Sequence, residues 1–276
     1  QRGRRRCSKN SVRTGADEVL FMNSENPIGI TDSGVGGLTV AREVQRLLPG
    51  EDILYFGDSA NCPYGNKTRE QLLGFAGKML SFLAARGIKL DALACNTTSS
   101  MIEDLTDCSG VPLLGIIEPA ARLAAAENLQ YVGLISTEFT AASKSYDRMI
   151  ERFSPNTRVI SKGSPSLAAL VECGAFDYDA IDAEIRREVS DILSRGPVKD
   201  IILACTHYPI VLDRFEACFP DIRFIDPSRE QALAVRKKLA AQNLLSGRSH
   251  GSLTICTSGE PSVYRTMCTR LGIETK

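Results

Sequence analysis

The sequence lacks several residues and patterns on which common classes of site depend. It contains no tryptophan and only two histidines, His207 and His250, so a histidine-rich metal site is not expected. Its nine cysteines form no C-x-x-C pair, which argues against both a zinc knuckle and a disulfide framework. We therefore expect free thiols, a reducing cytoplasm and no metal.

Long hydrophobic runs and an excess of one charge are also absent. No segment approaches the roughly 20 apolar residues of a membrane span. Thirty-three basic residues balance thirty-three acidic ones, so overall charge attracts neither nucleic acid nor a membrane. The first six residues include four arginines, but residues 1–26 have no apolar core of signal-peptide length. We predict a flexible, solvated tail there and no export.

What the sequence does contain is an alternation of short apolar runs with longer amphipathic ones. With 276 residues, 43% of them hydrophobic, the chain can bury a full core. The alternation predicts βα units around mainly parallel sheets. We expect a capped helix to begin at Thr68, with Gln71 reaching back, and to end near Gly87. Strands are expected near 27–31, 53–57, 91–95, 113–117, 131–136, 157–161, 200–205, 222–226 and 253–257.

Two cysteines occur in matching surroundings, in DALACNT at 91–97 and in DIILACTH at 200–207. An apolar run of this length is typical of a buried parallel strand, whose carboxyl end points into the crevice where α/β sheets bind ligands. A lone buried cysteine usually acts as a small hydrophobe, but the repeated context favours a site. Two thiols facing one substrate would suit removing a proton from one face of a carbon and returning one to the other.

The two cysteine strands lie about one domain length apart, which predicts two similar halves. We therefore expect an α/β fold of two similar doubly wound domains with mainly parallel sheets and an active site in the cleft between them. The first domain is predicted to comprise residues 27–117 and 229–276, and the second residues 118–228.

A glycine-rich segment, PIGITDSGVGGLT at 27–39, follows the first predicted strand and precedes a helix expected near Leu38. It matches neither the dinucleotide-binding fingerprint, because Thr39 occupies the last glycine position, nor a P-loop. Asp32 and Ser33 could simply cap the helix. Their place at a strand's carboxyl end favours a role in the site.

The turn-rich segment NCPYGN at 61–66 can present backbone amides and the Tyr64 phenol to an anionic ligand, although it also fits an ordinary surface turn.

Polar neighbours matter for the two thiols, because an unperturbed thiol is mostly protonated at neutral pH. Asp32 could serve Cys95 as such a neighbour. His207 stands two residues after Cys205, and Glu172 could reach the same place from a preceding helix. A histidine after a strand is often structural, yet the adjoining Cys205 and Thr206 favour a role in the site.

Four motifs carry a family resemblance: DSGVGGLTV at 32–40, CPYG at 62–65, ACNT at 94–97 and CTHYP at 205–209. In this order and spacing the chain resembles the glutamate racemases of the cofactor-independent aspartate/glutamate racemase superfamily, over about residues 27 to 275. The CTHYP motif favours glutamate over aspartate and hydantoin racemases. One departure is Thr98, where the family usually has a small alanine.

The resemblance implies that Cys95 and Cys205 are the two proton donors and acceptors, without a cofactor. It implies that Asp32, Glu172 and His207 tune and relay these protons. It also implies a homodimer, glutamate as the small-molecule partner and D-glutamate supply for peptidoglycan. The residues implied to hold the substrate are Asp32, Ser33, Tyr64, Gly65, Asn96, Thr97, Thr206 and His207.

Two other functions remain open from the sequence. The chain could be a racemase of aspartate or a related acid in the same superfamily. It could also be a non-catalytic ligand-binding protein on the same scaffold, although both thiols and their polar neighbours are intact.

Overall fold

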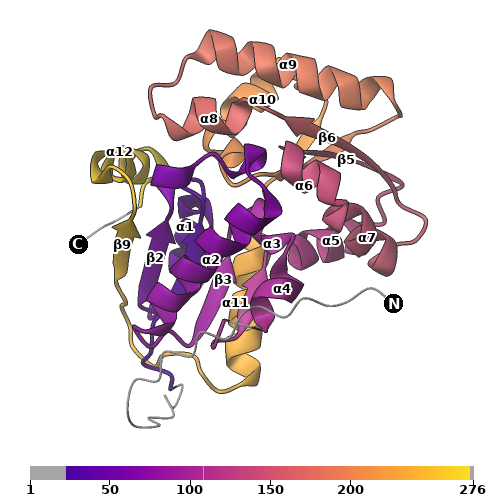
Figure 1. Ribbon diagram of the computed structural model, residues 1–276. Helices are drawn as coiled ribbons and strands as arrows, with labels where there is room; N and C mark the ends of the chain where they lie inside the picture. The colour runs from indigo at the N-terminus through magenta and orange to yellow at the C-terminus, as the bar shows by residue number, and fades with distance from the viewer. Residues whose placement is uncertain (1–22, 108, 274–276) are drawn as a thin grey trace.

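The computed structural model describes residues 23–107 and 109–273 and contains two separate β-sheets, with helices around each (Figure 1). Most of the predicted N-terminal tail, residues 1–22, lies outside the described residues, and residues 23–26 form a turn. Among the described residues, no helix combines the length and apolar character that crossing a membrane requires.

The first sheet has five parallel strands in the order β4-β3-β1-β2-β9. Its central strand is buried along its whole length, as expected for a parallel strand covered on both faces. In register, Ile30 lies opposite Tyr55 on one side and Ala92 on the other. The strands are β1 Ile28–Asp32, β2 Ile53–Gly57, β3 Leu90–Leu93, β4 Leu113–Gly115 and β9 Leu253–Thr257.

The second sheet has four parallel strands in the order β6-β5-β7-β8. One continuous apolar cluster includes buried residues of both sheets, such as Ile30 and Leu203. The strands are β5 Tyr131–Thr137, β6 Arg158–Ser164, β7 Asp200–Ala204 and β8 Arg223–Ile225.

Both sheets have the strand order of a doubly wound fold. In each, the chain passes from a central strand to one neighbour and then crosses to the other side of that central strand. The crossing leaves a crevice at the carboxyl ends, between β1 and β3 in one sheet and between β5 and β7 in the other. The predicted fold class, two doubly wound α/β halves, is therefore confirmed.

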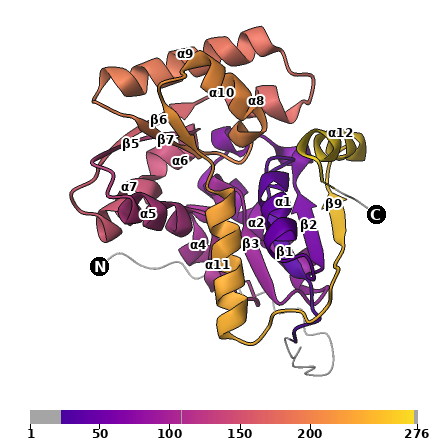
Figure 2. The same cartoon turned by 180° about the vertical axis from the view of Figure 1, so that it is seen from behind.

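Helices cover both faces of the first sheet: α1 and α11 pack together on one face, and α2 lies on the other (Figures 1 and 2). In the second half, α9 packs on β5 and β6, and α8 and α10 pack on α9. Short 3₁₀ segments occur at Ser59–Asn61, Tyr64–Asn66 and Tyr208–Val211. The α-helices are α1 Leu38–Leu47, α2 Arg69–Ala84, α3 Asn96–Ser99, α4 Ile102–Thr106, α5 Ile117–Ala126, α6 Glu138–Ser143, α7 Ser145–Phe153, α8 Leu167–Glu172, α9 Tyr178–Ser194, α10 Leu212–Cys218, α11 Ser228–Ala241 and α12 Pro261–Leu271.

The helix predicted after Thr68 is present with the predicted cap. The Gln71 amide donates to Thr68 Oγ1 at 3.3 Å, and the Thr68 amide donates to Gln71 Oε1 at 2.9 Å. This reciprocal pair satisfies two backbone donors at the helix start. The helix ends at Ala84, and Gly87 follows with a left-handed φ of 71°.

All nine predicted strands occur; β2 and β9 have the predicted ends, and the ends of the others are shifted. The β3 strand ends at Leu93, two residues before the predicted end, because Cys95 already caps the short helix α3. The β4 strand is likewise shorter than predicted, because Ile117 begins α5. The β6 strand instead continues to Ser164, paired with β5 throughout.

Candidate active site

The two cysteines of the repeated motif line one small cavity between the two sheets. Cys95 follows β3 and Cys205 follows β7, the strands that border the two crevices. Both side chains are buried. The cavity has a volume of about 10 Å³, far below the roughly 300 Å³ at which small-molecule pockets begin, so a substrate requires the cleft to open.

Cys95 is surrounded by a hydroxyl and a carboxylate of the β1 end. Its thiol donates to the Ser33 hydroxyl, with Sγ 3.6 Å from Oγ. Burial raises the pKa of the Cys95 thiol, and the negative charge of Asp32 adds to the effect, because both disfavour a thiolate. Both effects favour the thiol form of Cys95.

Asp32 is a fully buried carboxyl group at the end of β1. Burial raises its pKa to about 6, although the positive charge of His207 and backbone N–H groups lower it in part. The Gly34 amide donates to Oδ2 at 3.1 Å, and the Thr206 hydroxyl donates to Oδ1 at 3.1 Å. The second bond joins the end of β1 to the turn after β7, so Asp32 connects the surroundings of the two thiols.

Cys205 lies beside an imidazole that a carboxylate holds in place. Its Sγ is 3.7 Å from His207 Nδ1, and His207 Nε2 is 2.6 Å from Glu172 Oε2. Burial by itself lowers the pKa of His207, but hydrogen bonds with Cys205, Cys62 and Glu172 more than offset it. The pKa of His207 therefore lies well above its ordinary value, and the ring can exchange a proton with Cys205.

Glu172, the last residue of α8, also contacts loops of the first sheet. Its Oε2 accepts from the Val35 amide at 2.9 Å, and its Oε1 accepts from the Ser59 hydroxyl at 2.5 Å. Burial would raise the pKa of Glu172, but the hydrogen bond and charge of His207, with these donors, lower it overall. Glu172 thus remains ionised while it orients His207 and ties the two halves together.

Tyr64 lies in the cavity wall, but its phenol is already engaged. The hydroxyl donates to Asp58 Oδ2 at 2.6 Å. Gly65 packs closely on the other half, since a Cβ atom at this position would lie 2.9 Å from Thr137 Cβ. The Cys62–Pro63 peptide bond in this segment is cis. Cys62, Pro63 and Tyr64 of this segment line the small cavity.

Asn96 and Thr97, directly after Cys95, also line the cavity. Asn96 Oδ1 accepts from the Tyr146 hydroxyl at 2.6 Å, whereas its Nδ2 is buried and has no hydrogen-bond partner among the described residues. Because a buried unpaired amide is costly, Nδ2 is a donor available to a bound carboxylate. Thr97 Oγ1 lies 2.9 Å from Thr137 Oγ1, across the interface of the two halves.

Cys62, Thr137 and Ser59 are among the residues of the site that were not predicted from the sequence. Cys62 belongs to the CPYG motif and lines the cavity, but no second thiol motif points to it. Thr137 ends β5, so the strand-end signal that identified the other residues could have identified it too. Ser59 begins a 3₁₀ segment of the first half and holds Glu172 of the second, a contact for which the sequence offers no signal.

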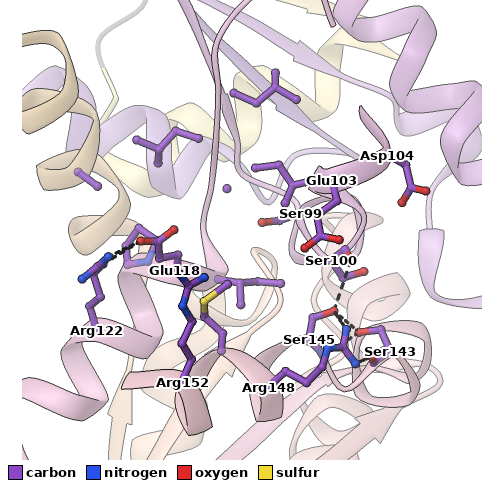
Figure 3. A pocket seen from close by; sticks show the side chains of 18 of the residues that line it. Ser99, Ser100, Glu103, Asp104, Glu118, Arg122, Ser143, Ser145, Arg148 and Arg152 are labelled. Atoms are coloured by element: carbon purple, nitrogen blue, oxygen red, sulfur yellow. Dashed lines mark hydrogen bonds and ion pairs between the residues drawn. The ribbon is translucent and has the colours of Figure 1, made fainter. Parts of the chain in front are cut away.

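Figure 3 shows a second cavity, of about 1110 Å³, whose lining includes neither Cys95 nor Cys205. Arginines of α5 and α7 reach into it, and Arg122 pairs with Glu118 at 2.7 Å. It includes none of the residues predicted to be catalytic or to bind substrate. The larger cavity is therefore not the one in which the candidate chemistry is assembled.

Known proteins resemble this chain along most of its length. A glutamate racemase from Thermus thermophilus is 38% identical over 247 residues, which cover 89% of this chain and 92% of the relative. A glutamate racemase from Herpetosiphon aurantiacus is 33% identical over 91% of this chain and 99% of its own length.

Solved structures share the fold. The glutamate racemase isoform RacE1 from Bacillus anthracis superimposes with a TM-score of 0.85, at 30% identity, over 92% of this chain and 97% of the other. The Francisella tularensis glutamate racemase in complex with D-glutamate superimposes with a TM-score of 0.84, at 29% identity, over 92% of this chain and 96% of the other. The model of the Asp/Glu/Hydantoin racemase family matches residues 36–235. This match and the identity to the glutamate racemases show that the chain, with its paired strand-end cysteines, belongs to that racemase family.

Proposed function

We propose that this protein is a glutamate racemase that interconverts L- and D-glutamate with Cys95 and Cys205 as its two acid/base groups. The observation that carries the proposal is the placement of both thiols on one cavity, each at the crevice of a different sheet. The relatives of similar length that are named glutamate racemases support glutamate as the substrate.

The proposed chemistry is a two-base proton transfer. One cysteine, as thiolate, removes the α-proton from one face of the substrate, and the other, as thiol, returns a proton to the opposite face. The α-proton of an amino acid is very weakly acidic, so the site must stabilise carbanion-like charge with fixed donors in a water-poor cleft. The two thiols supply both proton transfers, and we propose that no cofactor takes part.

The polar neighbours divide between the two thiols. On the first side, Ser33 and Asp32 adjoin Cys95. On the second, His207 relays a proton to and from Cys205, and Glu172 orients the ring. A positioned group of this kind contributes typically about 10²- to 10⁴-fold in rate.

The remaining predicted residues are proposed to hold the substrate. Asn96 Nδ2, a buried donor that has no partner in residues 23–107 and 109–273, is suited to a substrate carboxylate. Asp32 suits the ammonium group. The other proposed contacts are Ser33, Tyr64, Gly65, Thr97, Thr206 and His207.

We further propose a homodimer that acts in the cytoplasm, supplying D-glutamate for peptidoglycan. The seven cysteines in the described part of the chain are free thiols, which suits a reducing compartment. We propose domain boundaries at 27–117 with 229–276, and at 118–228. These boundaries assign each sheet to one domain.

The test is to incubate purified, metal-free and pyridoxal-phosphate-free protein with L-glutamate in deuterated water. Loss of optical rotation, together with entry of deuterium at the α-carbon, is the expected result. Turnover of aspartate but not glutamate would move the assignment to a related racemase. Exchange with neither amino acid would favour a ligand-binding protein on this scaffold.

A further inference from the structure

The site also brings together three groups that have the chemistry of metal ligands. The sulfur of Cys62, a carboxylate oxygen of Glu172 and a ring nitrogen of His207 all lie within 4.8 Å of one another. Around a Zn²⁺ ion, bonds of about 2.0 to 2.3 Å place neighbouring ligand atoms roughly 3 to 4 Å apart. Small movements of these three side chains would therefore bring all of them to bonding distance.

The ligand set selects the class of metal. A thiolate with an imidazole favours Zn²⁺ and related thiophilic cations, whereas Mg²⁺ and Ca²⁺ prefer oxygen ligands alone. His207 is 1% exposed, and Cys62 and Glu172 are partly buried. Three protein ligands leave one position of a tetrahedral ion open for water or a further ligand.

The size of the adjoining cavity agrees with an ion. At about 10 Å³ it is close to the volume of one water-sized sphere, too small for an amino acid without opening of the cleft. Cys62, Cys205 and His207 line it together. Two of the three proposed ligands, Cys62 and His207, thus lie at this cavity, and Glu172 reaches His207 from outside its lining.

We propose that Zn²⁺, or another thiophilic divalent cation, binds Cys62, Glu172 and His207 and thereby inhibits the racemase reversibly. On binding, the Cys62 thiol releases its proton to solvent and the metal–sulfur bond forms. The metal occupies His207 and Glu172, so the ring no longer relays protons to Cys205. The metal binding stands apart from the proposed function, whereas its inhibitory effect rests on it.

No metal was expected from the sequence, because it contains only two histidines and no C-x-x-C pair. The proposed cation does not alter the expected cofactor-free chemistry. It opposes that chemistry by sequestering the groups that serve Cys205.

The direct test is titration of reduced, metal-free protein with Co²⁺, whose thiolate complexes absorb in the near ultraviolet. The wild-type protein should develop this charge-transfer band. Cys62→Ser should lose the band and bind Co²⁺ at least about tenfold more weakly. Even the loss of a residue that only supports a metal ligand typically weakens metal binding by that factor. The matched control is Cys256→Ser on β9, outside the three-residue cluster, which should keep the wild-type band and affinity.

Glu172→Gln provides a second variant if Cys62→Ser fails to fold, as judged by circular dichroism. It should keep the sulfur band but bind Co²⁺ at least about tenfold more weakly. No band in the wild-type protein, or equal affinity in the wild-type protein, Cys62→Ser and Glu172→Gln, would overturn the site.

The kinetic test is Zn²⁺ inhibition that a chelator reverses, with a half-inhibiting concentration at least about tenfold higher in Cys62→Ser than in Cys256→Ser. Racemisation that Zn²⁺ does not inhibit would overturn the inhibitory role. A protein without racemase activity that still shows the Co²⁺ band would overturn the proposed function and leave the metal site standing.

Discussion

The two cysteines have the same place in their sheets but different chemical neighbours. Cys95 borders the first crevice, with the Ser33 hydroxyl and the Asp32 carboxylate nearby. Cys205 borders the second, where His207 stands 3.7 Å from its sulfur and Glu172 holds the ring. The repeated fold therefore supplies two similar positions, and the loops around them make the positions chemically unequal.

This difference indicates a division of labour. A buried carboxylate close to Cys95 disfavours a thiolate there, whereas an imidazole beside Cys205 can accept a thiol proton. We expect Cys95 to begin as the acid and Cys205 as the base. Each catalytic cycle then leaves the roles reversed, and the pair must exchange protons before the next turnover in the same direction.

The largest expected effect comes from removing either thiol. Cys95→Ala and Cys205→Ala should each lower racemisation by at least about 10⁴-fold, since neither remaining cysteine can serve both faces. Polarimetry with L- and D-glutamate measures this. Cys256→Ala, on β9 outside the small cavity, serves as the control and should keep near wild-type activity. Activity in either single variant within tenfold of wild type would contradict the requirement for both thiols.

Removing the polar neighbours should affect the two faces differently. His207→Asn should slow proton transfer at Cys205, and Asp32→Asn that at Cys95, each by about 10²- to 10⁴-fold. The measurement is α-hydrogen exchange in deuterated water, started separately from each enantiomer. One variant should slow α-hydrogen exchange more for L-glutamate, and the other should slow it more for D-glutamate. Equal slowing of both enantiomers in both variants would contradict a division of labour.

Asp32 should also make stability depend on pH. Its pKa lies at about 6 against an ordinary 3.8, so the folded state binds this proton more tightly than the unfolded state. The free energy of unfolding should therefore fall as pH rises from about 4 to about 6, by at most roughly 3 kcal/mol, since each pH unit between two pKa values corresponds to about 1.4 kcal/mol.

Asp32→Asn should remove this dependence and be the more stable protein above about pH 6. The gain in its free energy of unfolding should be smaller than the roughly 3 kcal/mol given above. The asparagine amide nitrogen cannot accept the hydrogen bond that one carboxylate oxygen accepts now. Urea unfolding between pH 4 and pH 8 measures the effect. Identical pH profiles for the two proteins would show that the buried carboxyl does not titrate as expected.

Glu172→Gln tests the surroundings of Cys205 with a smaller change. A hydrogen bond to a charged group is worth roughly 1.5–3 kcal/mol, so we expect about a 10- to 100-fold loss of kcat. The pKa of His207 should fall, because the carboxylate that stabilises its protonated form is gone. Nuclear magnetic resonance titration of the ring reports this. An unchanged His207 pKa would mean that Glu172 only supports the fold.

The sequence predicted the sheets better than it predicted the loops. Buried parallel strands leave a strong local pattern, and DIILACTH carries its own strand, thiol and histidine within eight residues. The predicted strand ends erred where a helix started early, as at Cys95, because the competition between strand and cap is decided by backbone contacts.

Contacts between segments far apart in the chain were harder to predict from the sequence. Glu172 was placed near the second thiol from its helix, but its bonds to Val35 and Ser59 depend on how the two halves pack. The proximity of Cys62 to His207 is of the same kind, since the two residues belong to different halves. No periodicity or spacing encodes such contacts, so they require the structure.

The most direct test of the two-thiol account is the isotope content after the first turnovers of L-glutamate in deuterated water. Separate acid and base thiols on opposite faces predict D-glutamate that carries α-deuterium from the start, while the remaining L-glutamate keeps its α-protium. Early D-glutamate that retains the α-protium, or deuterium entering L-glutamate as fast as it enters the product, would contradict the account.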